Sequence, residues 1–324
     1  MRLRTYLLAA LTAALWLPGC QLVDTKCDQE CVDNWLDGGN FTDPCLDSAT
    51  KCLVSERIPS PSDQEKDSLG IIIAVHGFTA TSFEWGEFAA FADTARDYPQ
   101  VRVSRVVLGG HGRDLDAFRS STWEGWGESI LAEYDSLAKS GFKNISFACS
   151  STGCTLLMQY LSAGDFKKRP APKWIFMIDP IVVPTAKILS LVDVLGPILG
   201  NSPNKGDSIE NHYWYVNRPE ETLKQLYALT NVVKNRLEDG FRLPEGTQAW
   251  VRKSKHDNSA DPVGALMIYK GMRKSDGGHV DVQLVDSRLH VFTRLAARSS
   301  TPSPADSALQ ITTFREMAGL ASQP

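Results

Sequence analysis

The chain alternates short, continuously apolar runs with segments in which apolar residues recur at helical spacing. An apolar run bounded by turn residues is typical of a strand buried on both faces of a parallel sheet, whereas helical spacing predicts an amphipathic helix. The order of the two patterns predicts an α/β protein. The expected strands are residues 70–75, 101–108, 145–149, 174–178, 248–252 and 280–285, and the main expected helices are 83–95, 123–137, 155–161, 222–237 and one after Ser303-Pro304.

One junction between a strand and a helix leaves almost no room for a loop. The run at 145–149 ends in Cys149-Ser150-Ser151-Thr152-Gly153, and a helical pattern starts directly afterwards. Such a joint forces the middle residue into a strained conformation and lifts its side chain above the sheet, as in the nucleophile elbow G-x-S-x-G. Cysteine stands where the first glycine is usual. Ser151 is therefore a candidate nucleophile, and a Ser/Thr turn capping an ordinary strand-helix unit is the alternative.

A second candidate site element follows the strand at 70–75. His76-Gly77-Phe78-Thr79 comes directly after it, where open α/β sheets place their chemistry. Serine hydrolases need two backbone N–H groups for the developing oxyanion, one after the nucleophile and one from an earlier loop. We expect Phe78 and Thr152 to provide them. His76 is expected to shape the loop and not to transfer protons.

Composition excludes some classes of partner. The formal net charge is −4, which gives no basic surface for nucleic acid. The glycine-rich stretch Gly109-Gly-His-Gly112 lacks the spacing and the lysine of nucleotide-binding loops. The length of 324 residues and the apolar content of 43% fit one α/β domain with an insertion better than two independent domains.

Three motifs occur in the order and at the separations found in the α/β-hydrolase superfamily: His76-Gly77-Phe78, Gly110-His111-Gly112 and the Ser151 junction. Residues 70–292 resemble that superfamily, and in particular bacterial carboxylesterases and monoacylglycerol lipases. The resemblance implies a mostly parallel central sheet with helices on both faces and an inserted, mainly helical cap. It also implies a catalytic triad in the chain order Ser, acid, His.

Two strand ends offer a carboxylate. Asp179 follows the strand at 174–178, and Asp257 follows the strand at 248–252. The segment His256-Asp-Asn-Ser-Ala-Asp261-Pro resembles the acid loop of the superfamily, which favours Asp257 as the triad acid and leaves Asp179 in reserve. Asp261 is then expected to start the next helix.

The general base follows by elimination. Of the histidines after Ser151, His212 lies in the long insertion, His279 precedes the last expected strand, and only His290 follows it. Active sites of open α/β sheets lie at the exit ends of strands, so His290 is the expected base and His279 an expected surface residue. His256, next to Asp257, is the competing candidate.

The segment between the two acid candidates is longer than an ordinary connection. Its apolar stretches predict a cap and, with it, a small ester substrate that has an apolar acyl or aromatic part. Residues that only pack the cap onto the core are the alternative. The expected domains are 1–19 signal peptide, 20–69 Cys-rich segment and linker, 70–181 and 247–324 hydrolase core, and 182–246 cap.

The N-terminus carries features of export. Arg2 and Arg4 precede an apolar run that is short for a transmembrane helix and ends in Leu17-Pro-Gly-Cys20. This ending resembles the lipobox of bacterial lipoproteins, which implies lipidation of Cys20, attachment to a membrane and, with Gln21 next, the outer membrane. A soluble periplasmic or secreted protein is the alternative.

Six of the seven cysteines remain after Cys20. Four crowd into the polar segment before residue 55, where we expect two disulfides of open connectivity and rank a zinc site lower. Cys149 and Cys154 are either bonded to each other or two buried thiols. The four clustered cysteines are Cys27, Cys31, Cys45 and Cys52.

Together these features predict a serine hydrolase that cleaves carboxylic esters through an acyl-enzyme, with Ser151, His290 and Asp257 as triad and no metal or organic cofactor. Acyl transfer to another alcohol and thioester hydrolysis would use the same residues. The alternative from another class is a lipid-anchored binding protein on an inactive hydrolase scaffold, favoured only by the missing first glycine.

Overall fold

The computed structural model describes residues 62–113, 115–185, 201–203, 213–215, 217–298 and 301–323. The expected signal peptide, the lipidation residue Cys20, the four clustered cysteines and most of the expected cap before residue 213 lie outside these residues. Within the described residues, no helix combines the length and the apolar character needed to span a bilayer.

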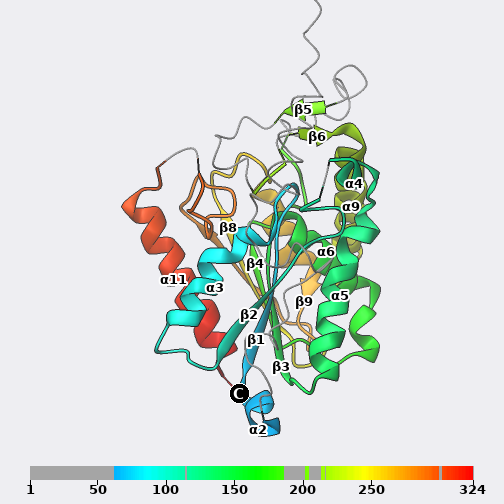
Figure 1. Cartoon of the computed structure of the whole chain (residues 1–324). Coiled ribbons are helices and arrows are strands. Elements are labelled where there is room, and N and C mark those ends of the chain that lie inside the picture. The colour runs from blue at the N-terminus through cyan, green and yellow to red at the C-terminus, as the bar shows by residue number, and fades with distance from the viewer. Residues whose placement is uncertain are drawn as a thin grey trace, which may run out of the picture.

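A central sheet of six strands organises the described residues (Figure 1). Its order is β10-β8-β4-β3-β1-β2, and every neighbouring pair is parallel. All carboxyl ends therefore meet at one edge of the sheet, which is the edge where open α/β sheets bind their ligands. The strands are β1 (Gly70–Val75), β2 (Val101–Val106), β3 (Asn144–Ser150), β4 (Trp174–Ile178), β8 (Gln248–Ser254) and β10 (Asp281–Val285).

Helices cover both faces of the sheet, with α3 and α11 on one side and the other long helices opposite them (Figure 1). The first face carries α3 (Gly86–Thr94), preceded by the 3-10 turn η3 (Ser82–Trp85), and α11 (Pro304–Ala321). The helices of the opposite face are α4 (Leu115–Ser120), α5 (Trp123–Lys139), α6 (Ser151–Ala163), α9 (Glu220–Asp239) and α10 (Val263–Gly271).

The two faces have separate hydrophobic cores. Along β1, Ile71 and Ile73 enter the cluster beneath α5, α6 and α9, whereas Ile72 enters the cluster beneath α3 and α11. Successive side chains of a strand point to opposite faces, so a strand covered on both sides must be apolar at every position. All six residues of β1 are accordingly buried.

Most of the expected elements are present, with their ends shifted by a few residues. The expected helix at 83–95 begins as the turn η3 before it becomes α3, and the expected strand at 101–108 stops at Val106. The C-terminal helix begins at Pro304 after Ser303, whose hydroxyl accepts the N–H of Asp306.

The linker was expected to extend to residue 69, but residues before the first strand form the helix α2 (Asp63–Ser68). The hydroxyl of Ser62 accepts the N–H of Glu65, and the Glu65 carboxylate accepts the N–H of Ser62. This reciprocal capping box satisfies N–H groups that a first helical turn otherwise leaves unpaired. The sequence contains the Ser-x-x-Glu signature of this capping box, although the proline and charged residues around it favoured a linker.

The long connection between β4 and β8 contributes to two regions. The short strands β5 (Asn201–Pro203) and β6 (Asn217–Pro219) pair with each other near the carboxyl edge of the sheet (Figure 1). Helix α9 instead packs beside α6 and α10, and its buried Leu226, Leu229 and Leu237 belong to the same hydrophobic cluster as the sheet. Small additional elements are η4 (Asp165–Lys168) and the paired β7 (Phe241–Arg242) and β9 (Met272–Arg273).

Candidate active site

Ser151 stands at the joint between β3 and α6 and has a φ of 46°, in the left-handed region that serine rarely adopts. The joint is tight because helix and strand pass close to each other. A Cβ atom at Gly153 would lie 2.6 Å from the carbonyl oxygen of His76 and 2.7 Å from that of Val75. Backbone atoms on both sides therefore require glycine at 153, as the elbow pattern demands.

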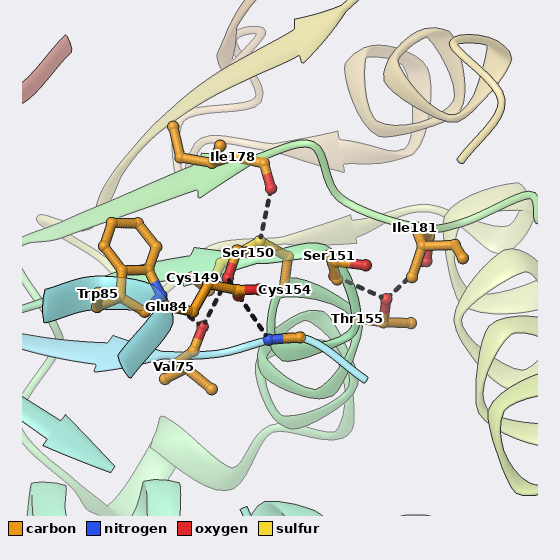
Figure 2. Close-up of a disulfide and its surroundings, with 11 residues drawn as sticks. Val75, Glu84, Trp85, Cys149, Ser150, Ser151, Cys154, Thr155, Ile178 and Ile181 are labelled. Carbon is orange, nitrogen blue, oxygen red and sulfur yellow. Dashed lines mark hydrogen bonds between the residues drawn. A yellow bond between two sulfur atoms is a disulfide. The ribbon is translucent and has the colours of Figure 1, made fainter. Parts of the chain in front are cut away.

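A disulfide between Cys149 and Cys154 spans this joint (Figure 2). It ties the end of β3 to the first turn of α6, with a Cα–Cα distance of 4.9 Å, and both cysteines are fully buried. The Sγ of Cys154 also lies 3.9 Å from the carbonyl oxygen of Ile178 at the end of β4. The cysteine that replaces the first elbow glycine thus forms a covalent link across the elbow.

Ser151, His290 and Asp257 form one hydrogen-bonded chain. The Nε2 atom of His290 lies 2.8 Å from the Oγ of Ser151, and its Nδ1 atom lies 2.7 Å from an Oδ2 oxygen of Asp257. Because a carboxylate only accepts, the neutral imidazole carries its proton on Nδ1 and leaves the Nε2 lone pair for the serine hydroxyl. The His290 side chain is 24% exposed, whereas the carboxylate of Asp257 is buried.

Asp257 is held as an anion from two sides. Its Oδ1 accepts the N–H groups of Ser259 and Ala260 at 2.7 and 3.1 Å, and its Oδ2 contacts both His290 and the ammonium of Lys253. Burial raises the pKa of Asp257, but the charges of His290 and Lys253 and their hydrogen bonds together outweigh it and bring the pKa well below its ordinary value. Asp257 is therefore ionised at neutral pH.

Asp179 lies beside this chain without joining it. Its carboxylate accepts the N–H of Ser254 at 2.7 Å, the hydroxyl of Ser254 at 3.1 Å and the ammonium of Lys253 at 3.3 Å. The ligand atoms of Asp179, Asp257 and His290 lie within 4.8 Å of one another, a spacing that a metal ion can use. The ammonium of Lys253 already contacts both carboxylates, so it supplies the charge that a cation would bring, and we assign no metal site.

The loop after β1 passes directly beside Ser151. A Cβ atom at Gly77 would lie 3.0 Å from the Cβ of Ser151. The N–H of Gly77 donates to the buried carboxylate of Glu84 at 2.8 Å, and the hydroxyl of Ser150 donates to the same oxygen (Figure 2). Glu84 therefore fastens the loop to the elbow and occupies the N–H of Gly77, which leaves the N–H of Phe78 as the next donor. The N–H of Thr152 belongs to the unpaired first turn of α6.

No protein-family model and no curated protein matches the sequence, but solved structures match the fold. A structure of the metagenome-derived lipolytic enzymes LipS and LipT is 20% identical, with a TM-score of 0.57 over 79% of this chain and 95% of that one. A monoacylglycerol lipase of Paleococcus ferrophilus is 11% identical, with a TM-score of 0.55 over 78% and 96%. A soluble variant of the monoglyceride lipase of Saccharomyces cerevisiae, solved with a substrate analogue, is 9% identical, with a TM-score of 0.59 over 79% and 86%.

The chain has the α/β-hydrolase fold. The fold expected from the three motifs is confirmed. Identities of this size show the fold alone, because one fold carries many functions.

Strained backbone conformations are concentrated around the candidate active site. Of the five described non-glycine residues with positive φ, four lie in the loops that surround the triad candidates. Strained residues of this kind persist only where the surrounding structure enforces them, and they concentrate at functional sites. These four are Thr79 (φ 63°), Ser151 (46°), Asp179 (47°) and Val291 (54°).

Hydrogen bonds to its main chain hold the loop that carries His290. The guanidinium of Arg298 donates to the carbonyl oxygens of His290 and Val291, both at 2.8 Å. The hydroxyl of Ser254 donates to the carbonyl of Leu289 at 2.8 Å. The imidazole is thus positioned by contacts that do not involve its own ring, which leaves the ring for Ser151 and Asp257.

The other histidines of the described residues have partners of their own. His256 has an exposed side chain 3.7 Å from Asp286, and exposed His279 stacks on Tyr269 with ring centroids 4.0 Å apart. His76 is fully buried, and its Nε2 accepts the N–H of Leu108 at 3.0 Å, so it joins the loops after β1 and β2 as expected of a structural residue. His212 lies outside the described residues.

His111 of the glycine-rich loop is buried among aromatic rings. Phe118 is 4.7 Å and Trp126 is 5.4 Å from it between centroids. Burial, and next the nearby His76, lower the pKa of His111 well below its ordinary value, against a hydrogen bond with the carbonyl of Gly109 that raises it. A histidine kept neutral in this way packs the base of the loop and carries no charge to the site.

Sequence reasoning missed Lys253, Glu84 and Arg298. Lys253 had a visible signal, since a lysine inside a strand that is otherwise buried must find anionic partners. Glu84 and Arg298 had none, because no pattern in the sequence indicates that Glu84 would accept hydrogen bonds from Gly77 and Ser150 or that Arg298 would donate to the carbonyl of His290. Asp261, in contrast, lies where the sequence indicated, with its carboxylate accepting the N–H of Val263 at the start of α10.

Proposed function

We propose that this chain is a serine hydrolase that cleaves carboxylic esters through an acyl-enzyme. The observation that carries the proposal is the continuous hydrogen-bonded chain from Ser151 through His290 to Asp257, at the carboxyl edge of the sheet. The lipolytic character of the enzymes with the same fold supports ester hydrolysis as the reaction class.

In the proposed reaction, the Oγ of Ser151 attacks the ester carbonyl while the Nε2 of His290 takes the hydroxyl proton. Asp257 stabilises the imidazolium that forms and stays ionised. The oxyanion of the tetrahedral intermediate receives hydrogen bonds from the N–H groups of Phe78 and Thr152. The intermediate collapses as His290 returns the proton to the leaving alcohol, and Ser151 keeps the acyl group.

Water then completes the cycle. His290 removes one proton from a water molecule as its oxygen attacks the acyl carbon, and the second oxyanion uses the same two N–H groups. Collapse releases the carboxylic acid, and the proton on His290 returns to the Oγ of Ser151. The reaction consumes one ester and one water molecule, and no step requires a metal or an organic cofactor.

The substrate we propose has an apolar acyl or aromatic part. Among the described residues of the long connection, Tyr213 stacks on Phe83 with centroids 3.5 Å apart, and Tyr215 stacks on Phe118 at 4.3 Å. The N–H of Tyr215 donates to the carbonyl of Thr79 in the loop after β1, at 2.9 Å. Tyr215 and Phe118 are fully buried and fix this part of the connection against the core, whereas Phe83 and Tyr213 are partly exposed. A partly exposed aromatic pair beside the loops around Ser151 supports a substrate with apolar groups.

The alternative of an inactive scaffold rested on the missing first glycine of the elbow. Cys149 at this position is buried and bonded to Cys154, and Ser151 keeps the strained conformation of an elbow. The elbow therefore keeps its geometry with cysteine in place of the first glycine, and this replacement does not favour loss of activity.

The test is hydrolysis of p-nitrophenyl esters of increasing acyl length by the full chain purified in detergent. We expect Ser151→Ala to lose at least about 10⁴-fold in kcat, since the nucleophile is removed. The matched control is Ser162→Ala, which removes a serine near the far end of α6. The circular dichroism spectrum of each variant shows whether its fold is kept.

Equal rates in wild type and Ser151→Ala would overturn the assignment of Ser151. Activity in neither protein would favour the binding-protein alternative. Adding short alcohols and analysing the products separates hydrolysis from acyl transfer, since a transferase forms a new ester in water, and thioester substrates test the third possibility.

We also propose that Cys20 is lipidated and attaches the chain to the bacterial outer membrane, on the sequence features at residues 2–21. Expression of the full chain in a bacterial host, followed by fractionation, tests this. Wild type is expected in the outer membrane fraction and Cys20→Ala outside it. Identical fractionation of the two proteins would contradict lipidation at this residue.

A further inference from the structure

Lys253 is a fully buried lysine directly behind the proposed triad. It lies on β8, its side chain is 0% exposed, and its Nζ contacts Asp179 and Asp257, whose carboxylates are also 0% exposed. A buried charge is costly unless it is paired and hydrogen-bonded. Neither Lys253 nor Asp179 takes part in the steps proposed for Ser151, His290 and Asp257. Their position beside Asp257 therefore points to an effect of this buried charge pair on the triad.

We propose that Lys253 and Asp179 are positioning residues that act as a charge-balancing pair, which sets the pH range in which His290 can accept the proton of Ser151. The inference rests on the proposed function. It assigns roles to two residues that do not touch the substrate: both act on His290 through the charge of the buried cluster, and Lys253 also acts through its contact with Asp257.

The net charge of the buried cluster sets the direction in which the pair changes proton uptake by His290. With His290 neutral, Asp179, Lys253 and Asp257 sum to −1, and with His290 protonated the cluster sums to 0. Proton transfer from Ser151 to His290 therefore brings the buried cluster to neutrality. Charges a few ångströms apart in a buried site interact strongly, so changing the sum by one unit must change how readily the imidazole takes a proton.

Removing each member of the pair shifts this balance in opposite directions. Without Lys253 the two carboxylates stay uncompensated and favour the imidazolium, so His290 is blocked by a proton already at higher pH. Without the charge of Asp179 the cluster is neutral before proton transfer and positive after it, so the imidazolium is disfavoured. Removing both returns the sum to −1.

Other charged or titratable groups lie on the loops and strand ends around the site, and they are unchanged in the single and double variants of the pair, so their effects cancel in the comparison. Arg298 bonds to the carbonyl of His290, and Glu84 lies behind the elbow, bonded to Gly77 and Ser150. Further groups on neighbouring elements include His76 and His111 in the loops after β1 and β2, the pair His256 and Asp286, and Arg294 over Trp214. Lys255 and Arg288 are on the segments that carry Asp257 and His290.

A merely structural role for the pair predicts a different result. Loss of packing or of a hydrogen bond lowers activity or stability, but it does not move the pH dependence in opposite directions for the two members. It also does not restore the pH dependence when both are removed, because two structural defects add or exceed the single ones.

The experiment compares four variants of the full chain: Lys253→Met, Asp179→Asn, the double variant and Lys255→Met. Methionine and asparagine keep the approximate shapes while removing the charges. Lys255→Met is the matched control, because it removes the same charge from an exposed position two residues along the chain. The first readout is kcat/KM for a p-nitrophenyl ester against pH.

We expect the acid limb of the profile to move up by roughly 1 pH unit or more in Lys253→Met and down by a similar amount in Asp179→Asn. The double variant and Lys255→Met should lie within about 0.3 pH unit of wild type, since neither changes the net charge of the buried cluster. Shifts in the same direction for both single variants, or no shift in either, would overturn the proposal.

The second readout does not depend on catalysis. The imidazole resonances of His290, followed by NMR against pH in the Ser151→Ala background, should show the same opposite displacements. If wild type hydrolyses no ester and the displacements are present, the proposed function fails and the charge balance stands. If Lys253→Met does not fold, Asp179→Asn against the double variant still decides, because only charge balance makes the second mutation reverse the first.

Discussion

Ser151 and Asp257 both lie at the carboxyl edge of the sheet, but different forces hold them. Around Ser151 the constraints are steric and covalent: a strained φ, a glycine that no other residue can replace, and a disulfide across the elbow. Around Asp257 they are electrostatic, with a buried ammonium, an imidazole and two backbone N–H groups on one carboxylate.

This difference has a physical consequence. Steric and covalent constraints keep their strength when pH changes, so the position of Ser151 should be insensitive to it. The constraints on Asp257 depend on protonation, and they weaken when the carboxylate takes up a proton. The nucleophile side of the site should therefore respond to changes of side-chain volume and the acid side to changes of charge.

The largest expected effect tests which acid belongs to the triad. Asp257→Asn removes the acceptor that fixes the His290 tautomer and should lower kcat about 10⁴-fold. Asp179→Asn should cost less than about 10-fold at the pH optimum, because the Asp179 carboxylate bonds to Ser254 and Lys253, whereas that of Asp257 lies 2.7 Å from the imidazole. Steady-state kinetics on one ester measures both. A larger loss in Asp179→Asn would exchange the two roles.

The next effect tests the steric side. Gly153→Ala places a methyl group against the backbone oxygens of His76 and Val75 and should destabilise the protein by about 3 kcal/mol. Gly125→Ala in α5 is the control, since its added Cβ would meet only the hydroxyl of Thr122 at an ordinary 3.7 Å. Urea unfolding at neutral pH measures both free energies. Equal stability of the two variants would show that the elbow tolerates a side chain.

A smaller effect is expected from the disulfide. Cys149→Ala/Cys154→Ala opens a link between residues five positions apart and should lower the free energy of unfolding by about 2 kcal/mol. Wild type treated with a reductant under denaturing conditions and refolded should match the double variant. Retention of full stability in the double variant would mean that sterics alone hold the elbow.

The smallest effect concerns the acid side and pH. The pKa of Asp257 is lowered in the folded protein by His290 and Lys253 against the effect of burial, so its ionisation stabilises the fold above the ordinary carboxyl pKa. As pH falls from the ordinary carboxyl pKa toward the lowered pKa of Asp257, this stabilisation is lost, and the free energy of unfolding decreases by about 1 kcal/mol. Unfolding of wild type and Asp257→Asn between pH 3 and 7 measures it. Parallel pH profiles for the two proteins would contradict it.

The sequence by itself determined the layers and the positions of the candidate site. Apolar runs that must be buried on both faces predicted the strands β1, β3 and β4 to within a residue or two, because no other structure suits such runs so well. It also singled out Ser151 and His290 and limited the acid to Asp257 or Asp179, since parallel strands leave their exit ends at one edge. The resemblance to the acid loop of the superfamily then favoured Asp257.

What the tertiary structure decided are the contacts between distant segments. Whether Cys149 and Cys154 bond, and which carboxylate faces His290, depended on distances that no spacing in the sequence fixes. The helix α2 was not predicted, because the proline and charged residues of its segment favoured a linker despite the capping box. Lys253 shows the physical reason most clearly: its charge is stable in the core only because the ends of β4 and β8 and the loop after β8 bring two carboxylates to it, and such compensation exists only in the folded chain.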